Sequence, residues 1–339
     1  MLQGLAPGAL GLSTGCLGEV LRNRREWSYS PGEVFFGSPA VAEGTVHVGS
    51  DDGTFRALNA ADGTISWEFN AGESLVGRVS TRGDTVFAGG LDGGLYAMPM
   101  SGDSPHWDTK LPRSVLAPHQ TDDAVFVGGD EEHGVYSVAV ADGTHDDRFA
   151  GAPANTSPPE VSETTIYVGD NAGVVTAFDR ETGEKGWQHS LGKRIVTTPA
   201  LGDGRIYVGC FDNRIYALDA ENGSEHWHVQ TGDVIYSSPA VVDGTVYLGS
   251  NDGNVYALGT ESGTERWTFG TSDAVLSSPT VSDGTVYVGD FSGTMYALDA
   301  RDGAEMWRID VGEKIQSKAA VDADNLYVGH SKGIVAIAR

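Results

Sequence analysis

Short apolar runs alternate with polar turns along almost the whole chain. One stretch shows the pattern most clearly, with predicted strands at 237–242, 245–249, 254–258 and 266–269. Pairs such as Asp243-Gly244 and Ser262-Gly263 separate these strands. Alternation that is broken by Asp-Gly turns indicates antiparallel hairpins, because such pairs favour the tight turns that join two strands. The pattern predicts units of four short antiparallel strands, and helical periodicity is nearly absent.

The tryptophans show that this four-strand unit repeats. They are Trp27, Trp67, Trp107, Trp187, Trp227, Trp267 and Trp307. Every spacing is 40 residues except one of 80, whose midpoint is Asp147. The turn Asp142-Gly143-Thr144 keeps the register before Asp147, so this repeat has only lost its tryptophan. A fixed period of roughly 40 residues predicts either a propeller or a solenoid.

The two ends of the chain favour the propeller. The N-terminal region supplies only the fourth strand of a repeat, at Trp27, and the C-terminal region supplies the first three, at 318–321, 325–328 and 334–338. A solenoid has no reason to divide a repeat in this way, because it does not close. We therefore predict an all-β, eight-bladed β-propeller with four antiparallel strands per blade. The N-terminal outer strand and the three C-terminal strands close the ring.

The charge of the chain narrows the choice of partners and environments. It has 22 basic and 47 acidic residues, which gives a formal net charge of −25. Nucleic-acid binding needs a basic surface, so we expect no nucleic-acid partner. In molar salt, charge effects are screened within about 3 Å, and dense carboxylates stay hydrated. We interpret the charge as the adaptation of an extreme halophile. An acidic solubilising surface is the alternative interpretation.

The segment before the tryptophans points to a family. Residues 177–187, Ala-Phe-Asp-Arg-Glu-Thr-Gly-Glu-Lys-Gly-Trp, have the form A-x-D-x-x-T-G-x-x-x-W. The segments ending at Trp227 and Trp307 repeat it with Asn or Asp in place of Thr. This resembles the tryptophan-docking motif of PQQ-type (quinoprotein) propellers, and the resemblance covers residues 27–339. It implies that the seven tryptophans are structural docking residues without a chemical role.

The resemblance leaves two functional classes open. The family includes PQQ-dependent alcohol and sugar dehydrogenases as well as BamB-like non-catalytic lipoprotein propellers. Its alcohol dehydrogenases typically have adjacent cysteines, a calcium site and long insertions, whereas this chain has only Cys16 and Cys210 and no insertion in its repeats. A cofactor with three carboxylates also needs a cluster of Arg or Lys side chains. We therefore predict no catalytic residues, no cofactor and no metal. A quinoprotein dehydrogenase or a degenerate relative is the alternative.

Residues 1–16 resemble a signal segment with a lipobox. Residues 1–18 contain no charge, and Ser13-Thr14-Gly15 precede Cys16, the predicted lipidation site. The basic stretch that normally begins such a signal is missing, so a signal that starts before Met1 and a flexible tail both stay open. We divide the chain into the signal-like segment 1–16, a tether 17–26 and the propeller 27–339. This division predicts an extracytoplasmic protein with a lipid anchor at the cell surface. A cytoplasmic protein is the alternative.

The predicted function is a non-catalytic, surface-anchored scaffold. We expect a monomer that binds protein or another extracytoplasmic ligand and meets the membrane only through its anchor. A ligand-sensing module of a membrane complex is a further alternative. The propeller fold itself does not decide between these functions, because function depends on the site that a fold carries.

The candidate binding residues lie on one face of the predicted ring. Alternating strand direction places the loops between blades and the turn between the second and third strands of each blade on this face, here the connection face. The other turns form the hairpin face, which consists mostly of tight acidic turns such as Asp203-Gly204. Arg78 and His119 depart from the small residues and prolines usual at their repeat positions. The predicted ligand- or partner-binding residues are Phe36, Arg78, Arg113, His119, Lys193, Arg194 and Tyr236. Their basic members predict a negatively charged group at the mouth of the central channel.

Overall fold

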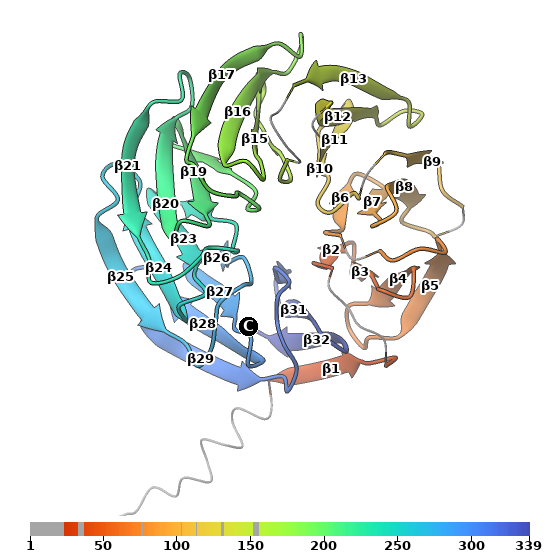
Figure 1. Ribbon diagram of the computed structural model, residues 1–339. Helices are drawn as coiled ribbons and strands as arrows, with labels where there is room; N and C mark the ends of the chain where they lie inside the picture. Colours follow the sequence, from red (N-terminus) through yellow and green to blue (C-terminus); the bar gives the residue numbers. More distant parts are fainter. Residues whose placement is uncertain are drawn as a thin grey trace, which may run out of the picture.

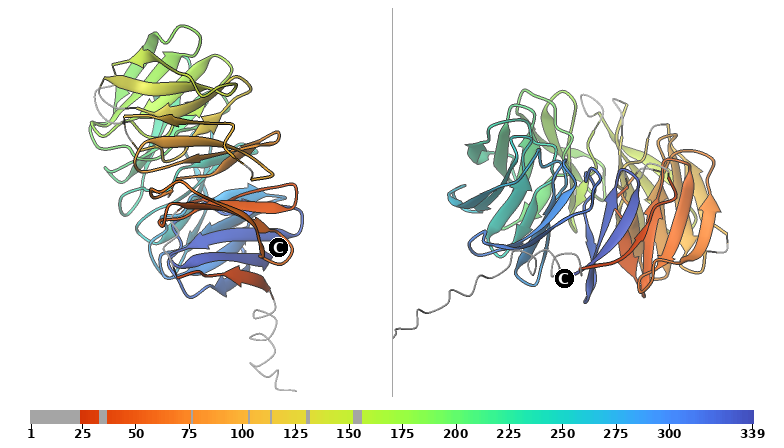
Figure 2. Two further views of the ribbon diagram at one scale, coloured as in Figure 1. Left: turned by 90° about the vertical axis from the view of Figure 1, so that its right-hand side faces the viewer. Right: turned by 90° about the horizontal axis from the view of Figure 1, so that it is seen from below.

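A computed structural model describes residues 24–32, 37–75, 77–102, 104–112, 114–129, 132–151 and 156–339. Eight antiparallel sheets of four strands each surround a central axis as blades (Figure 1). Seen from the side, the blades form a short ring with loops at both ends (Figure 2). The described residues contain no helix that is long and apolar enough to cross a membrane. The prediction of an all-β, eight-bladed propeller is confirmed.

Seven blades follow one another along the chain, each with its first strand nearest the axis. Blade I contains β2 (Ala40–Ala42), β3 (Thr45–Gly49), β4 (Thr54–Asn59) and β5 (Ile65–Asn70). Blades II and III contain β6 (Ser80–Arg82), β7 (Thr85–Gly89), β8 (Gly94–Pro99), β9 (Trp107–Lys110), β10 (His119–Gln120), β11 (Ala124–Gly128), β12 (His133–Ala139) and β13 (His145–Ala150). Blades IV and V contain β14 (Glu160–Val161), β15 (Thr165–Gly169), β16 (Val174–Asp179), β17 (Lys185–Ser190), β18 (Ala200–Gly202), β19 (Arg205–Cys210), β20 (Arg214–Asp219) and β21 (Glu225–Gln230). Blades VI and VII contain β22 (Ala240–Val242), β23 (Thr245–Gly249), β24 (Asn254–Gly259), β25 (Glu265–Gly270), β26 (Thr280–Ser282), β27 (Thr285–Gly289), β28 (Thr294–Asp299) and β29 (Glu305–Asp310).

Blade VIII joins the two ends of the chain. It consists of β30 (Ala320–Val321), β31 (Asn325–His330), β32 (Gly333–Ala338) and, as its outer strand, β1 (Arg25–Tyr29). β1 lies antiparallel beside β32 (Figure 1). In the register of this pair, Trp27 lies opposite Ala336. The first strand of blade I, β2, contacts both β6 and β30, so the ring is closed. This confirms the predicted closure by one N-terminal and three C-terminal strands.

The apolar core lies between the blades. In the described residues, one buried apolar cluster occupies each boundary between neighbouring blades, including the boundary between blades VIII and I. The second and third strands are buried on both faces; β23, for example, is buried over its whole length. A strand that is covered on both sides reads as a nearly continuous apolar run, as Val246-Tyr247-Leu248 does. The stability of each blade therefore depends on its two neighbours.

The tryptophans of the outer strands link neighbouring blades. Six of them donate a hydrogen bond from the indole Nε1 to a backbone carbonyl 33 residues further along the chain: Trp27 to Ala60, Trp67 to Met100, Trp107 to Val140, Trp187 to Ala220, Trp227 to Thr260 and Trp267 to Ala300, at 2.7–3.1 Å. The glycine of the adjoining turn makes room for the ring. A Cβ at Gly223, for example, would lie 2.4 Å from the ring of Trp187. Glycine is also favoured there because its φ is 73°.

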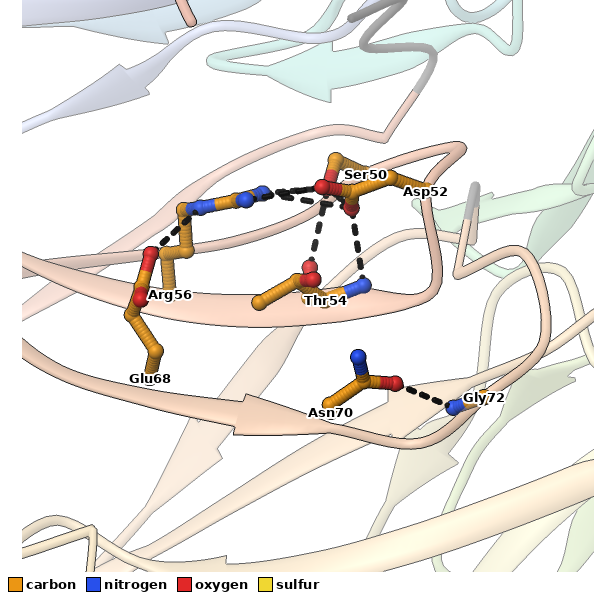
Figure 3. A network of polar contacts seen from close by, with 7 residues as sticks. All are labelled: Ser50, Asp52, Thr54, Arg56, Glu68, Asn70 and Gly72. Carbon is orange, nitrogen blue, oxygen red and sulfur yellow. Dashed lines mark hydrogen bonds and ion pairs between the residues drawn. The ribbon is translucent and has the colours of Figure 1, made fainter.

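Blade I contains a polar network at a position where other blades have tyrosine. In blade VI, the hydroxyl of Tyr256 donates to Asp252 at 2.6 Å. The equivalent residue in blade I is the buried Arg56, whose guanidinium binds Asp52 at 2.7 Å and Glu68 at 2.9 Å (Figure 3). Burial alone would raise the pKa of the Asp52 carboxyl, but the hydrogen bonds from Arg56 and its neighbours outweigh burial and lower that pKa. Arg56 therefore takes over the structural role of a tyrosine.

Candidate functional site

The predicted site residues do not form one cluster. Cys16, Phe36 and Arg113 lie outside the described residues. The remaining residues separate into two groups: Lys193, Arg194 and Tyr236 at the rim of the connection face, and Arg78 and His119 in the central channel. Each group includes residues that the sequence analysis did not identify.

The first group, here the rim cluster, consists of Lys193, Arg194, Phe211 and Tyr236. Lys193 and Arg194 lie in the loop between blades IV and V, and both are exposed. The Arg194 guanidinium lies 5.4 Å from the centroid of the Phe211 ring, and its Nε donates to the Asn171 side chain at 2.8 Å. The Phe211 and Tyr236 rings meet edge to face at 4.8 Å. Tyr236 nevertheless remains 43% exposed, so the cluster presents aromatic and cationic surface to a partner.

Phe211 is the rim residue that sequence reasoning missed. It begins the turn between β19 and β20, and its backbone N–H donates to the carbonyl of Arg194 at 3.0 Å. The equivalent positions in other repeats are mostly not aromatic, as Asp51, Asn171 and Asn251 show, and Phe291 is the exception, so an aromatic residue at this turn was a usable signal. The edge-to-face contact with Tyr236 places Phe211 at the boundary between blades V and VI. Arg194 and Tyr236, 42 residues apart in sequence, are thereby brought into one surface.

The second group, here the channel cluster, consists of Arg78, His119, Glu160 and Lys318. Arg78, Glu160 and Lys318 line a cavity of about 600 Å³ at the axis of the ring. The same three residues and His119 line an adjoining hollow of about 300 Å³. The Nδ1 atom of His119 lies 3.9 Å from Oε2 of Glu160. Arg78 and His119 were predicted from the sequence, whereas Glu160 and Lys318, which replace the small residues that most other repeats have at their positions, were not.

Arg78 and Lys318 replace serines that connect the blades elsewhere. At this repeat position, the hydroxyl oxygen accepts a hydrogen bond from a backbone N–H of the preceding blade: Ser238 from Thr198, Ser278 from Ser238 and Ser38 from Lys318, at 2.9–3.0 Å. Arginine and lysine side chains are donors only and accept no such bond. The two substitutions therefore give up a structural hydrogen bond at blades II and VIII. Blade packing does not account for the cations.

The charges of the channel cluster act on one another; His119, Glu160 and Lys318 are half-buried, whereas Arg78 is exposed within the channel. Burial raises the pKa of Glu160 to about 7, although the positive charge of Arg78 opposes this shift. Burial and the charge of Arg78 lower the pKa of Lys318 to about 8. The pKa of His119 is lowered by burial and by Arg78. Solvent reaches Arg78 inside the channel, but the surrounding protein still lowers its pKa because desolvation penalises the charged form.

The channel cluster has the chemistry of a site for a negatively charged group. It brings two cations, one carboxylate and one histidine to a cavity of ligand size. Within the part of the chain that the structure describes, no three His, Cys, Asp or Glu side chains are arranged to hold a metal ion. Burial also raises the pKa of the Cys210 thiol to about 12, which makes it a poor nucleophile at neutral pH.

Solved structures of low sequence identity share this fold. A computationally designed protein, Ika8, has a TM-score of 0.84 at 17% identity, and the match covers 93% of this chain and 99% of that one. BamB from Moraxella catarrhalis has a TM-score of 0.76 at 20% identity, with 91% and 99% covered. A europium-containing methanol dehydrogenase has a TM-score of 0.73 at 15% identity, with 92% and 85% covered. These likenesses establish the fold alone.

The sequence itself matches a family. A comparison with curated proteins found no match. The sequence model of a family described as "Outer membrane protein assembly factor BamB" matches residues 22–82, 148–234 and 212–339. These segments cover more than half of the chain and include the split eighth blade and most of both residue clusters. The chain therefore belongs to the family of the outer membrane protein assembly factor BamB.

Proposed function

We propose that the protein is a non-catalytic, extracytoplasmic scaffold that is lipid-anchored through Cys16 and binds a protein partner through the rim cluster. The observation that carries this proposal is the exposed Tyr236, which packs on the half-buried Phe211 beside the exposed Arg194. Tyrosine and arginine are enriched among residues that dominate binding energy at protein interfaces. In a chain of net charge −25, the adjacent cations Lys193 and Arg194 favour a partner with an acidic patch. Membership of a family of assembly factors agrees with a protein partner.

Replacing Arg194 and Tyr236 with serine is expected to reduce capture of the native partner from membranes at least tenfold. The double variant removes one cationic and one aromatic anchor, each worth about 1–2 kcal/mol or more in a protein interface. The measurement is quantitative pull-down with the tagged full chain. Arg301→Ser is the matched control, because Arg301 is an exposed arginine on the hairpin face.

Three results would count against the proposal, one from this pull-down and two from separate measurements. Equal capture by wild type and by the folded double variant would remove the rim cluster as the docking surface. A Cys16→Ser protein that stays in the membrane fraction would contradict the lipid anchor. If the same preparations oxidise alcohols in a dye-linked assay with PQQ and calcium, the protein is an enzyme and the non-catalytic assignment is wrong.

We further propose that the protein functions in molar salt. With a net charge of −25, the folded state repels itself in dilute buffer. We expect the thermal unfolding midpoint to rise as KCl increases from dilute to molar concentration, because salt screens this repulsion. The measurement is a melting series in KCl, with sucrose at equal osmolality as the control. A midpoint that is flat or falls with KCl would contradict the interpretation.

A further inference from the structure

We propose that the central channel is a second binding site, which holds a small organic oxyanion, a carboxylate or a phosphate ester, between Arg78 and Lys318. The site is distinct from the rim cluster. No rim residue lines the channel cavity, whose described lining includes Arg78, Glu160 and Lys318. A protein partner at the rim and a small ligand in the channel are therefore separate events.

The first argument is that neither cation is held in a direct ion pair. In the described residues, the side-chain nitrogens of Arg78 and Lys318 form no hydrogen bond and no ion pair. Other enclosed cations of this protein are paired: Arg56 binds Asp52 and Glu68, and Arg339 binds Asp283. Enclosing a charge is costly unless it is paired. Glu160 acts on both cations through its charge without forming an ion pair with either, so one carboxylate faces two cations and the cluster keeps a positive charge that an anionic ligand can neutralise.

The second argument is that these cations replace a structural residue. Serine occupies the same repeat position in blades I, VI and VII, and its hydroxyl accepts a hydrogen bond from the preceding blade. Replacing serine with arginine or lysine loses this bond and brings two positive charges into one channel, where the charge of Arg78 lowers the pKa of Lys318, and both changes oppose stability. Two such changes converge on one cavity from blades II and VIII. Binding explains the convergence, whereas packing does not.

The size and walls of the channel indicate the class of ligand. A cavity of about 600 Å³ lies within the range of small-molecule sites and is much larger than a bare ion requires. Part of its wall is apolar, including Pro239, Pro279 and Val241. These surfaces suit the carbon skeleton of an organic anion, whose charged end reaches the cations. Arginine also matches the planar carboxylate and the phosphate group with paired hydrogen bonds.

The remaining members of the cluster make binding pH-dependent. The titratable and charged groups that face this part of the channel are Arg78, His119, Glu160 and Lys318, with Arg82 and Arg180 acting on His119 from further away. Glu160 has a pKa of about 7 and Lys318 one of about 8. Raising the pH across this interval adds a negative charge and removes a positive one. Oxyanion affinity is therefore expected to fall as the pH rises through this range.

The test is calorimetric titration of the full chain at fixed ionic strength with citrate, glycerol 3-phosphate, inorganic phosphate and glycerol. We expect citrate or glycerol 3-phosphate to bind the wild type more tightly than inorganic phosphate does, and glycerol not to bind. Citrate and glycerol 3-phosphate distinguish a carboxylate from a phosphate ligand. In the double variant Arg78→Ser/Lys318→Ser, affinity should fall at least tenfold. Arg194→Ser should bind as the wild type does.

The variants keep the test interpretable. Serine is the residue that other repeats carry at these positions, so the double variant should fold and melt at or above the wild-type temperature. The proposal is overturned if neither organic anion binds the wild type, or if the double variant binds it equally well. Affinity that does not fall between about pH 6 and pH 9 would also contradict the arrangement, because Glu160 and Lys318 titrate within that interval. Partner capture through the rim cluster is measured in a separate experiment, so either proposal can be contradicted without affecting the other.

Discussion

Deleting residues 24–31 is expected to open the ring and destabilise the whole propeller. These residues form β1, the outer strand of blade VIII, which pairs with β32 over Arg25–Tyr29. Trp27 lies in the core cluster between blades VIII and I, 5.9 Å from the ring of Tyr327, and donates to the carbonyl of Ala60 at 2.9 Å. Without β1, the N-terminal part of the chain no longer pairs with the C-terminal strand β32. β32 then presents an unpaired edge.

The expected loss is a large fraction of the stability of the protein. Removing a buried tryptophan alone costs about 3–5 kcal/mol, and the strand pairing is lost in addition. Total stabilities of folded domains are about 5–15 kcal/mol. The measurement is the urea or thermal midpoint of the deletion protein, with a chain that begins at Arg24 and retains β1 as its control. Equal midpoints for these two proteins would contradict closure through β1.

The fold could be predicted from the sequence because the repeat is regular. The Asp-Gly turns fix the hairpins, and the division of the last repeat between the two ends requires a closed ring. The first strands were the least accurate part. The prediction placed one at 318–321, whereas β30 contains only Ala320–Val321. The first strands converge on the axis, and in blade VIII pairing with β31 begins only at Ala320.

The site residues were harder to predict because the ring brings distant repeats together. Arg78 and His119 were identified as departures from the repeat, and Glu160 and Lys318 depart from it in the same way. Lys318 lies 240 residues from Arg78 in sequence, yet both line one cavity. Sequence order does not show which repeats face one another across a channel.

A departure from the repeat is also not sufficient evidence of function. Arg56 replaces a tyrosine, but its ion pairs with Asp52 and Glu68 support the structure of blade I (Figure 3). His47 is a second structural case. It occupies the position of Tyr167, Tyr207, Tyr247 and Tyr327, whose hydroxyls donate to a backbone carbonyl near the end of the third strand of the next blade. His47 is fully buried, and neither ring nitrogen has a hydrogen-bond partner among the described residues.

We expect His47 to make the protein sensitive to acid. Its ring lies 5.8 Å from that of Trp67 and 6.2 Å from that of Phe55, in surroundings that penalise a positive charge. Burial lowers the pKa of His47 to about 4, from 6.5 for an unperturbed histidine. The unfolded chain therefore binds this proton more readily than the native protein does. The contribution of His47 to stability is complete above pH 6.5 and is lost as the pH falls toward 4.

Replacing His47 with phenylalanine or tyrosine is expected to remove this loss. The shift in pKa corresponds to about 3 kcal/mol. The difference in free energy of unfolding between His47→Phe and the wild type should therefore be larger at about pH 4 than at neutral pH by this amount, in favour of the variant. Phenylalanine occupies the same position in Phe87 and Phe126, and it does not titrate. His47→Tyr should also gain a smaller amount of stability that does not depend on pH. The introduced hydroxyl can donate to the carbonyl of Met100, which already accepts a hydrogen bond from the indole N–H of Trp67. The measurement is the free energy of unfolding in urea from neutral pH to about pH 4. Subtracting each variant from the wild type cancels the other titrating groups, so parallel pH profiles for wild type and both variants would show that His47 is not the acid-sensitive residue.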